Sequence, residues 1–160
     1  MQFFLFRHAE KERSFSVDPS LSSRGLNQAL ALAQLVTDGE LSKPTVLLSS
    51  PKLRAQQTFQ PLAKDLQLRV QITPDLLERQ SQESSLQFVK RIKSTIAQVE
   101  KLSGVIYAVT HYDWIEDFLT VVSSDTDFYE GAYHSWPSGQ LMEFEIKDGL
   151  WQLNNFRNLT

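Results

Sequence analysis

The sequence predicts an α/β fold of three layers, with a mostly parallel central sheet flanked by helices and a C-terminal antiparallel hairpin at the sheet edge. Short apolar runs alternate along the chain with longer segments whose apolar residues recur at helical spacing. Near the C-terminus, two alternating segments are joined by Asp148-Gly149, a dipeptide that favours a hairpin turn. No internal repeat or linker interrupts this pattern, so residues 1–160 are expected to form one domain.

The first apolar run, Phe3–Phe6, predicts a strand covered on both faces, because its consecutive apolar side chains leave no polar side for solvent. The strand ends on the pair Arg7-His8, and the polar segment Lys11–Pro19 that follows is expected to be a loop. Ser22 or Ser23 then suits the N-cap of a helix, because a serine hydroxyl can accept a bond from a free backbone N–H.

This helix is expected to bury a broad apolar face and to end at Asp38-Gly39. The expected buried residues are Leu26, Ala29, Leu30, Leu32, Ala33 and Val36. A second buried strand, Thr45–Ser50, follows, and Pro51 suits a first helical position, where its missing N–H costs nothing. The next helix should carry Arg54 in its first turn and should be kinked or broken at Pro61.

The second half of the chain continues the alternation. Leu68–Thr73 alternates apolar and polar side chains, which is typical of a weaker strand at a sheet edge. The polar run Arg79–Ser85 is expected to be a loop, and the helical spacing after it predicts a helix over Leu86–Leu102. Gly104–Thr110 is the clearest strand pattern in the chain; it ends on His111 and precedes another helix.

Basic or nucleophilic side chains therefore follow three of the predicted strands: Arg7 and His8, Arg54, and His111. Because the carboxyl ends of parallel strands meet at one edge of a sheet, these residues can come together there. Two arginines and two histidines would form a pocket for a dianion, and a phosphoryl group is the obvious candidate. The formal net charge of −3 argues against a general nucleic-acid binder and makes this cationic concentration more informative.

The composition narrows the function classes further. No apolar run approaches the roughly 20 residues of a membrane span, and the first residues lack the basic leader of a signal peptide. The absence of cysteine excludes disulfides, thiolate catalysis and cysteine zinc sites, and is compatible with a reducing cytoplasm, the expected location. We expect a phosphorylated substrate as the partner, with neither nucleic acid nor membrane, while the oligomeric state stays open.

Four blocks of the sequence share a known pattern. They are Arg7-His8-Ala9-Glu10, the helix start from Asp18 to Ala29, the block Ser49–Thr58, and Val109-Thr110-His111. In this order they resemble the signatures of the histidine phosphatase superfamily, the phosphoglycerate-mutase-like group. These signatures are Arg-His-Gly-Glu, Leu-Ser/Thr-x-x-Gly-x-x-Gln-Ala, Ser-Ser-Pro-x-x-Arg-x-x-Gln-Thr and Val-Ser/Thr-His. The chain departs from the first at Ala9, which stands in the glycine position.

The resemblance implies a ping-pong phosphoryl transfer that needs neither a metal nor another cofactor. His8 would attack phosphorus and carry a covalent phosphohistidine, which water would then hydrolyse. Arg7, Arg54 and His111 would hold the phosphoryl oxygens and offset the charge of the transition state, the arginines replacing a metal cation.

The proton for the leaving group has several candidate sources. Glu78 stands where the family often supplies a carboxylic acid, but the glycine-containing pattern that usually follows is missing, so a solvated loop carboxylate is the alternative. Glu83 is a weaker candidate. Asp113 could reach the pocket or could simply help to start the helix after His111.

Three further residues have two interpretations each. Ser14 stands where phosphoglycerate mutases carry a phosphate-contacting asparagine, and could contribute a hydroxyl or nothing. Glu10 could orient a histidine or be a solvated loop residue. His134 could line the pocket mouth or be a loop histidine. The aromatic residues of its loop, 123–138, could recognise a substrate or cover the sheet end.

The segment between Arg54 and His111 is nearly filled by the predicted strand, loop and helix, which leaves no room for the lid that phosphoglycerate mutases usually insert. A phosphohistidine open to water should hydrolyse, so the chain is predicted to be a phosphatase. In size and layout it resembles small bacterial phosphohistidine phosphatases, which implies phosphohistidine of a protein partner as substrate. The alternatives are a phosphatase of small phosphate esters, favoured if Glu78 is a working acid, and a non-catalytic phosphoryl-binding protein.

Overall fold

A six-stranded sheet with the order β3-β2-β4-β1-β5-β6 lies at the centre of the computed structural model, which describes residues 1–160. The strands are β1 (Gln2–Arg7), β2 (Val46–Ser49), β3 (Val70–Ile72), β4 (Val105–Thr110), β5 (Gln140–Lys147) and β6 (Leu150–Asn158). Strands β1 to β4 pair in parallel, whereas β5 pairs antiparallel with both β1 and β6. The predicted mostly parallel sheet, with an antiparallel hairpin at one edge and a short strand at the other, is therefore confirmed.

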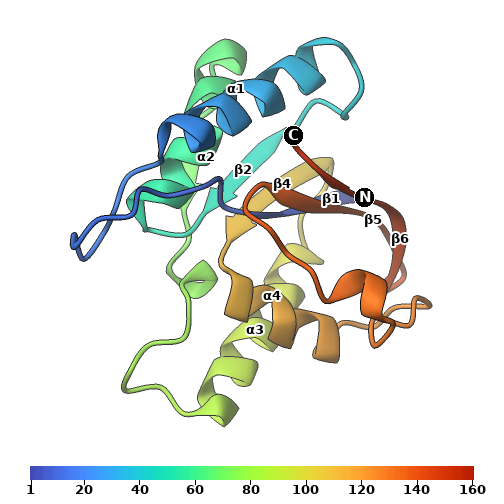
Figure 1. Ribbon diagram of the computed structural model, residues 1–160. Helices are drawn as coiled ribbons and strands as arrows, with labels where there is room; N and C mark the ends of the chain where they lie inside the picture. Colours follow the sequence, from blue (N-terminus) through green and yellow to red (C-terminus); the bar gives the residue numbers. More distant parts are fainter.

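Helices cover both faces of the sheet and make the three predicted layers (Figure 1). One face carries α1 (Ser23–Thr37) and α2 (Leu53–Leu66), and the other carries α3 (Ser85–Val99) and α4 (Tyr112–Val121). Two short 3₁₀ helices, η1 (Pro74–Leu76) and η2 (Gly131–Tyr133), lie in the connections. None of the helices combines the length and the apolar character that crossing a membrane requires.

The central strand β1 is buried on both faces, as its sequence predicts. Phe3 and Leu5 pack into the core beneath α3 and α4, whereas Phe4 and Phe6 pack into the core beneath α1 and α2. This alternation follows from the pleat of a strand, which points successive side chains to opposite faces. Burial on both sides holds the end of β1 in a fixed position relative to the neighbouring strands.

Helix α1 begins as predicted, with the Ser22 hydroxyl accepting a bond from the N–H of Gly25 at 3.1 Å, but its buried face differs from the prediction. Leu26 and Leu30 are 49% and 57% exposed, so their assignment to the core is wrong. The buried side includes Gly25 and Gln28 instead. The reason is a backbone contact between Gly25 and the segment after β1, which apolar periodicity does not report.

Helix α2 also departs from the prediction. It begins at Leu53, after Pro51 rather than on it, and continues past Pro61 to Leu66, so the predicted break is wrong. The N-cap residue Lys52 makes no capping bond, and the Asp18 carboxylate accepts from the N–H of Leu53 at 3.1 Å in its place. The free N–H groups at a helix start favour an anionic partner of this kind.

Gly25 carries the clearest stability prediction of the fold. A β-carbon on Gly25 would lie 2.0 Å from the carbonyl oxygen of Glu10, a backbone atom that cannot rotate away. Gly25→Ala should therefore lower the free energy of unfolding by about 1–3 kcal/mol or more, despite the better helix propensity of alanine. Urea unfolding measures this. Gly131→Ala is the control, because nothing lies within 4 Å of a β-carbon there, and equal stability of the two variants would contradict the prediction.

Candidate active site

The carboxyl ends of β1, β2 and β4 meet at one edge of the sheet. The register pairs Arg7 with Thr110 and Ser49 with Val109, so the residues that follow these strands are neighbours. His8 follows β1, and His111 follows β4 directly before α4. The two imidazole rings lie 5.3 Å apart, centroid to centroid.

His8 is held by its two ring nitrogens and is only 5% exposed. Its Nδ1 lies 2.8 Å from the carbonyl oxygen of Ala9, and its Nε2 lies 3.1 Å from Nε of Arg54. A carbonyl can only accept and a guanidinium can only donate, so these partners assign the proton to Nδ1 and the lone pair to Nε2. The nitrogen with the lone pair is the one that can act as a nucleophile.

Arg54 is the residue that joins the others. Besides His8, its guanidinium reaches Nδ1 of His111 at 3.1 Å and Oε1 of Glu78 at 3.3 Å, and it lies 3.7 Å from the Asp18 carboxylate. Its side chain is buried beside the first turn of α2. A single planar fork of donors thereby connects both histidines and two carboxylates.

His111 has a second contact that the sequence analysis missed. Its Nε2 lies 2.7 Å from the hydroxyl of Ser50 and 3.1 Å from Oε2 of Glu78. Because Nδ1 accepts from Arg54, the proton of the neutral ring belongs on Nε2, which donates to Ser50. The Ser-Ser-Pro block contained the signal for Ser50, since it places a hydroxyl at the end of β2, the strand next to β4.

The segment after η1 brings Glu78 to the same group of residues. Its carboxylate contacts Arg54 and His111, lies 3.6 Å from Nζ of Lys52, and is partly buried. Arg91 of α3 fixes the position of this segment by donating to the backbone carbonyls of Asp75, Leu77 and Glu78. It also pairs with Glu83 at 2.8 Å. Glu83 is therefore paired with α3 and forms no hydrogen bond or ion pair with either histidine.

Arg7 lies at the edge of this group. One of its terminal nitrogens donates to the backbone carbonyl of Trp136, and its guanidinium carbon lies 5.5 Å from the centre of the Tyr112 ring. Its Nε is buried without a hydrogen-bond partner. A cavity of about 590 Å³ opens beside Arg7 and His8 and is lined only by polar and charged residues, among them Lys11 and Ser14.

Two of the remaining predicted carboxylates contact neither histidine. Glu10 lines the same cavity, but its carboxylate accepts from the Ser22 hydroxyl at 2.8 Å and lies 3.5 Å from Arg24. Asp113 accepts from the backbone N–H of Arg79 at 2.8 Å and from that of Trp114. The structure thus brings together Arg7, His8, Arg54, His111 and Glu78, with Glu10 and Ser14 at the cavity wall.

Both histidines are neutral over a wide pH range. Burial lowers the pKa of His8 to about 3; the bond to the Ala9 carbonyl opposes this shift, and the charges of Arg54 and Arg7 add to it. Burial likewise lowers the pKa of His111 to about 3, helped by the charges of Arg54 and Lys52. A buried imidazole among fixed cations resists protonation, which would add a further positive charge.

These shifts predict an unusual pH dependence. For a small phosphate ester, with the ionisation of the substrate taken into account, kcat/KM reports the free enzyme and should keep its plateau well below pH 6.5. An acid limb near pH 6.5 would contradict this.

The same shifts predict how stability depends on pH. The unfolded chain binds protons on both histidines below pH 6.5, whereas the folded protein does so only near pH 3. The free energy of unfolding should therefore fall as the pH is lowered from 6.5 to about 3.

Comparison with known proteins supplies the family. The model of the histidine phosphatase superfamily (branch 1) matches residues 3–82, while no curated protein sequence gives a significant match. Among the many solved structures that share the fold, three phosphatases match nearly the whole of both chains. The protein histidine phosphatase SixA complexed with tungstate is 16% identical, with a TM-score of 0.76 over 99% of this chain and 97% of that one.

The other two structures are enzymes with different named substrates. The α-ribazole phosphatase from Shigella flexneri is 20% identical, with a TM-score of 0.78 over 100% of this chain and 98% of that one. A phosphoserine phosphatase mutant from Entamoeba histolytica, in complex with phosphoserine, is 17% identical, with a TM-score of 0.75 over 99% and 98%. At these identities the likeness concerns the fold alone. The family match, which spans half of the chain and includes Arg7, His8 and Arg54, shows that this protein belongs to the histidine phosphatase superfamily.

Proposed function

We propose that this protein is a metal-independent phosphatase that works through a covalent phosphohistidine at His8, and that its substrate is phosphohistidine on a protein partner. The observation that carries the proposal is the pair of contacts made by the His8 ring, which assigns a lone pair to Nε2, beside a polar cavity and 3.1 Å from a guanidinium nitrogen. The catalytic residues are His8, Arg7, Arg54, His111 and Glu78. Ser14 and Glu10 contact the substrate from the cavity wall, and Asp113 supports the site from the start of α4.

In the first step, Nε2 of His8 attacks phosphorus, and the bond from phosphorus to the leaving group breaks. Arg54 gives up its bond to Nε2 and donates to a phosphoryl oxygen instead, together with Arg7 and His111. The Nδ1–H bond to the Ala9 carbonyl offsets the positive charge on the phosphorylated ring. Water then attacks phosphorus, the N–P bond breaks, and phosphate leaves with His8 neutral again.

Glu78 is proposed to protonate the leaving group. Its contacts with Arg54 and His111 put a carboxyl group among the residues that would hold the phosphoryl oxygens. An alkoxide is a poor leaving group and needs this proton, whereas the nitrogen of a phosphoramidate is protonated easily. Loss of the acid should therefore affect the two substrate classes very differently.

Two features support a protein substrate over a small ester. The cavity is open and polar, and no segment between Arg54 and His111 beyond the loop that carries Glu78 is available to close over it. Next to the cavity, the loop after β1 carries Phe15 and Val17 fully exposed at its tip. Larger exposed apolar patches mark protein contacts, and these two side chains would be available to a protein partner bound at the cavity. Small phosphate esters are the alternative, because the α-ribazole and phosphoserine phosphatases share the fold.

A substrate panel tests the proposal. Wild type and Glu78→Gln are compared on a phosphohistidine protein, p-nitrophenyl phosphate and phosphoserine, with and without EDTA. We expect kcat/KM to be highest for phosphohistidine and nearly unchanged there by Glu78→Gln, while hydrolysis of phosphoserine falls by about 10²-fold. A preference for phosphoserine would favour the small-ester alternative. Loss of activity in EDTA would refute metal independence, and no turnover of any substrate would leave a phosphoryl-binding protein.

A further inference from the structure

A second cavity, of about 430 Å³, lies between α4 and the segment 122–138. Its walls combine aromatic rings with carboxylates. The aromatic residues are Tyr112, Phe128, Tyr129 and Tyr133, and the carboxylates are Glu116 and Asp117. The first cavity has no apolar lining at all, so the two cavities select for different chemical groups.

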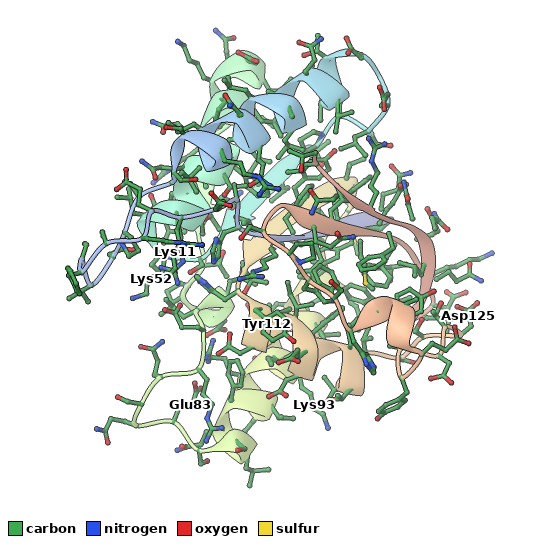
Figure 2. All side chains as sticks on the ribbon, viewed as in Figure 1. Lys11, Lys52, Glu83, Lys93, Tyr112 and Asp125 are labelled. Carbon is green, nitrogen blue, oxygen red and sulfur yellow. The ribbon has the colours of Figure 1, made fainter.

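Arg7 joins the second cavity to the proposed phosphate site. Its guanidinium carbon lies 5.5 Å from the centre of the Tyr112 ring, and it donates to the carbonyl of Trp136, in the segment that forms the opposite wall. Tyr112 itself directly follows His111. In Figure 2, Tyr112 lies with Lys11 and Lys52 on one side and the segment that carries Asp125 on the other. A substrate whose phosphoryl group contacts Arg7 can therefore extend past Tyr112 into the second cavity.

The carboxylates of this cavity have no cationic partner. Neither Glu116 nor Asp117 forms an ion pair, and no lysine or arginine lines the walls. Partial burial and the charges of Asp113 and Glu116 raise the pKa of Asp117, and the charge of Arg79 opposes this rise only in part. The neighbouring Glu116 raises the pKa of the Tyr112 hydroxyl, against the charge of Arg7. His134 is the one basic side chain of the lining, and it is exposed. The cavity is thus an anionic site with aromatic walls, and its two carboxylates form no ion pair within the protein.

We propose that this cavity binds a lysine or arginine side chain of the phosphorylated protein, close in sequence or in space to its phosphohistidine. The inference rests on the proposed function and adds a determinant of substrate choice to it. The faces of aromatic rings attract cations, and the effect adds to pairing with a carboxylate. An anionic group would be repelled by Glu116 and Asp117, and a neutral apolar group would leave their charges without a partner.

The arrangement makes the whole site bipolar. Arg7, Arg54 and Lys52 supply positive charge for the phosphoryl group, and α4 supplies negative charge one aromatic ring away. A phosphohistidine with a basic neighbour can pair with the cationic and the anionic part of the site at once, in one orientation only. A phosphohistidine with acidic neighbours would be repelled by the carboxylates of α4. Attraction in one case and repulsion in the other together produce specificity.

The test uses a series of phosphohistidine peptides that differ only in the position of one lysine, with norleucine as its uncharged replacement. For wild type, we expect kcat/KM to rise about 10-fold when lysine occupies the matching position, and this advantage to shrink in high salt. Glu116→Gln/Asp117→Asn should remove the advantage while leaving hydrolysis of p-nitrophenyl phosphate unchanged. Tyr129→Ser, which keeps both charges, should reduce the lysine advantage in part. This result would distinguish binding of the lysine in the cavity from long-range electrostatic attraction.

Glu130→Gln is the matched control, because Glu130 is an exposed carboxylate of the same segment that does not line the cavity; it should keep the full lysine advantage. If wild type hydrolyses all the peptides without any preference for lysine, the cation site is refuted while the phosphatase proposal stands. If p-nitrophenyl phosphate is hydrolysed and none of the peptides is, the protein substrate itself is refuted, and the cation site with it.

Discussion

Replacing His8 with alanine should lower the turnover of p-nitrophenyl phosphate by a factor on the order of 10⁴ or more. The substitution removes the nitrogen whose lone pair would attack phosphorus. His111 is not expected to replace it, because His111 does not line the polar cavity beside His8 and its Nε2 contacts Ser50 and Glu78. Steady-state kinetics of the purified variant measure the loss, and urea unfolding shows whether the fold survives the substitution.

The same variant also tests the covalent intermediate. The N–P bond of a phosphohistidine hydrolyses in acid, so the reaction with labelled substrate is stopped in alkali. Wild type should retain label on His8, and His8→Ala should retain none. The arginine groups stay in place, so His8→Ala should still bind inorganic phosphate. Label on the alanine variant, or turnover equal to wild type, would exclude His8 as the nucleophile.

Arg54→Lys should lower kcat by about 10²–10³-fold although the positive charge is kept. The planar guanidinium reaches His8 at 3.1 Å, His111 at 3.1 Å and Glu78 at 3.3 Å at the same time, and a single ammonium group cannot reproduce three divergent contacts. If Arg54 acts in the transition state as proposed, most of the loss should appear in kcat rather than in KM.

Arg157→Lys makes the same chemical change at a distant position, where Arg157 pairs with Glu40 at 3.4 Å on the surface, and it should leave kcat unchanged. Wild-type kcat in Arg54→Lys would show that the site needs only a positive charge at this position. A loss confined to the free energy of unfolding, with normal kcat, would show that Arg54 is a structural residue.

Local patterns in the sequence were sufficient for the elements and for the residues at their ends. The run Phe3–Phe6 predicts a strand buried on both faces, because such a strand needs apolar side chains at consecutive positions. This burial is observed. Once the strands are known to be parallel, Arg7, His8 and His111 must lie at one edge. The contact of His8 with Arg54 and of Arg54 with His111 follows from this topology.

The errors arose where a contact between distant segments overrides a local pattern. Leu26 and Leu30 fit the apolar stripe of α1, yet they face solvent because Gly25 packs on the backbone of Glu10 and sets the rotation of the helix. Proline usually disrupts a helix, but α2 continues through Pro61, with Phe59 and Leu62 buried in the core on either side of it. Periodicity cannot detect either effect.

The order of helices and strands, and with it the set of basic residues at one sheet edge, can be predicted from the sequence because both depend on spacing along the chain. The polar partner of each side chain depends instead on contacts between segments that are distant in sequence. Ser50 contacts His111, and the Glu10 carboxylate accepts from Ser22 and lies near Arg24. The Asp113 carboxylate accepts from the backbone N–H of Arg79. The aromatic and acidic cavity beside Arg7 likewise exists only in three dimensions, because α4 and the segment 122–138 form its walls by packing together.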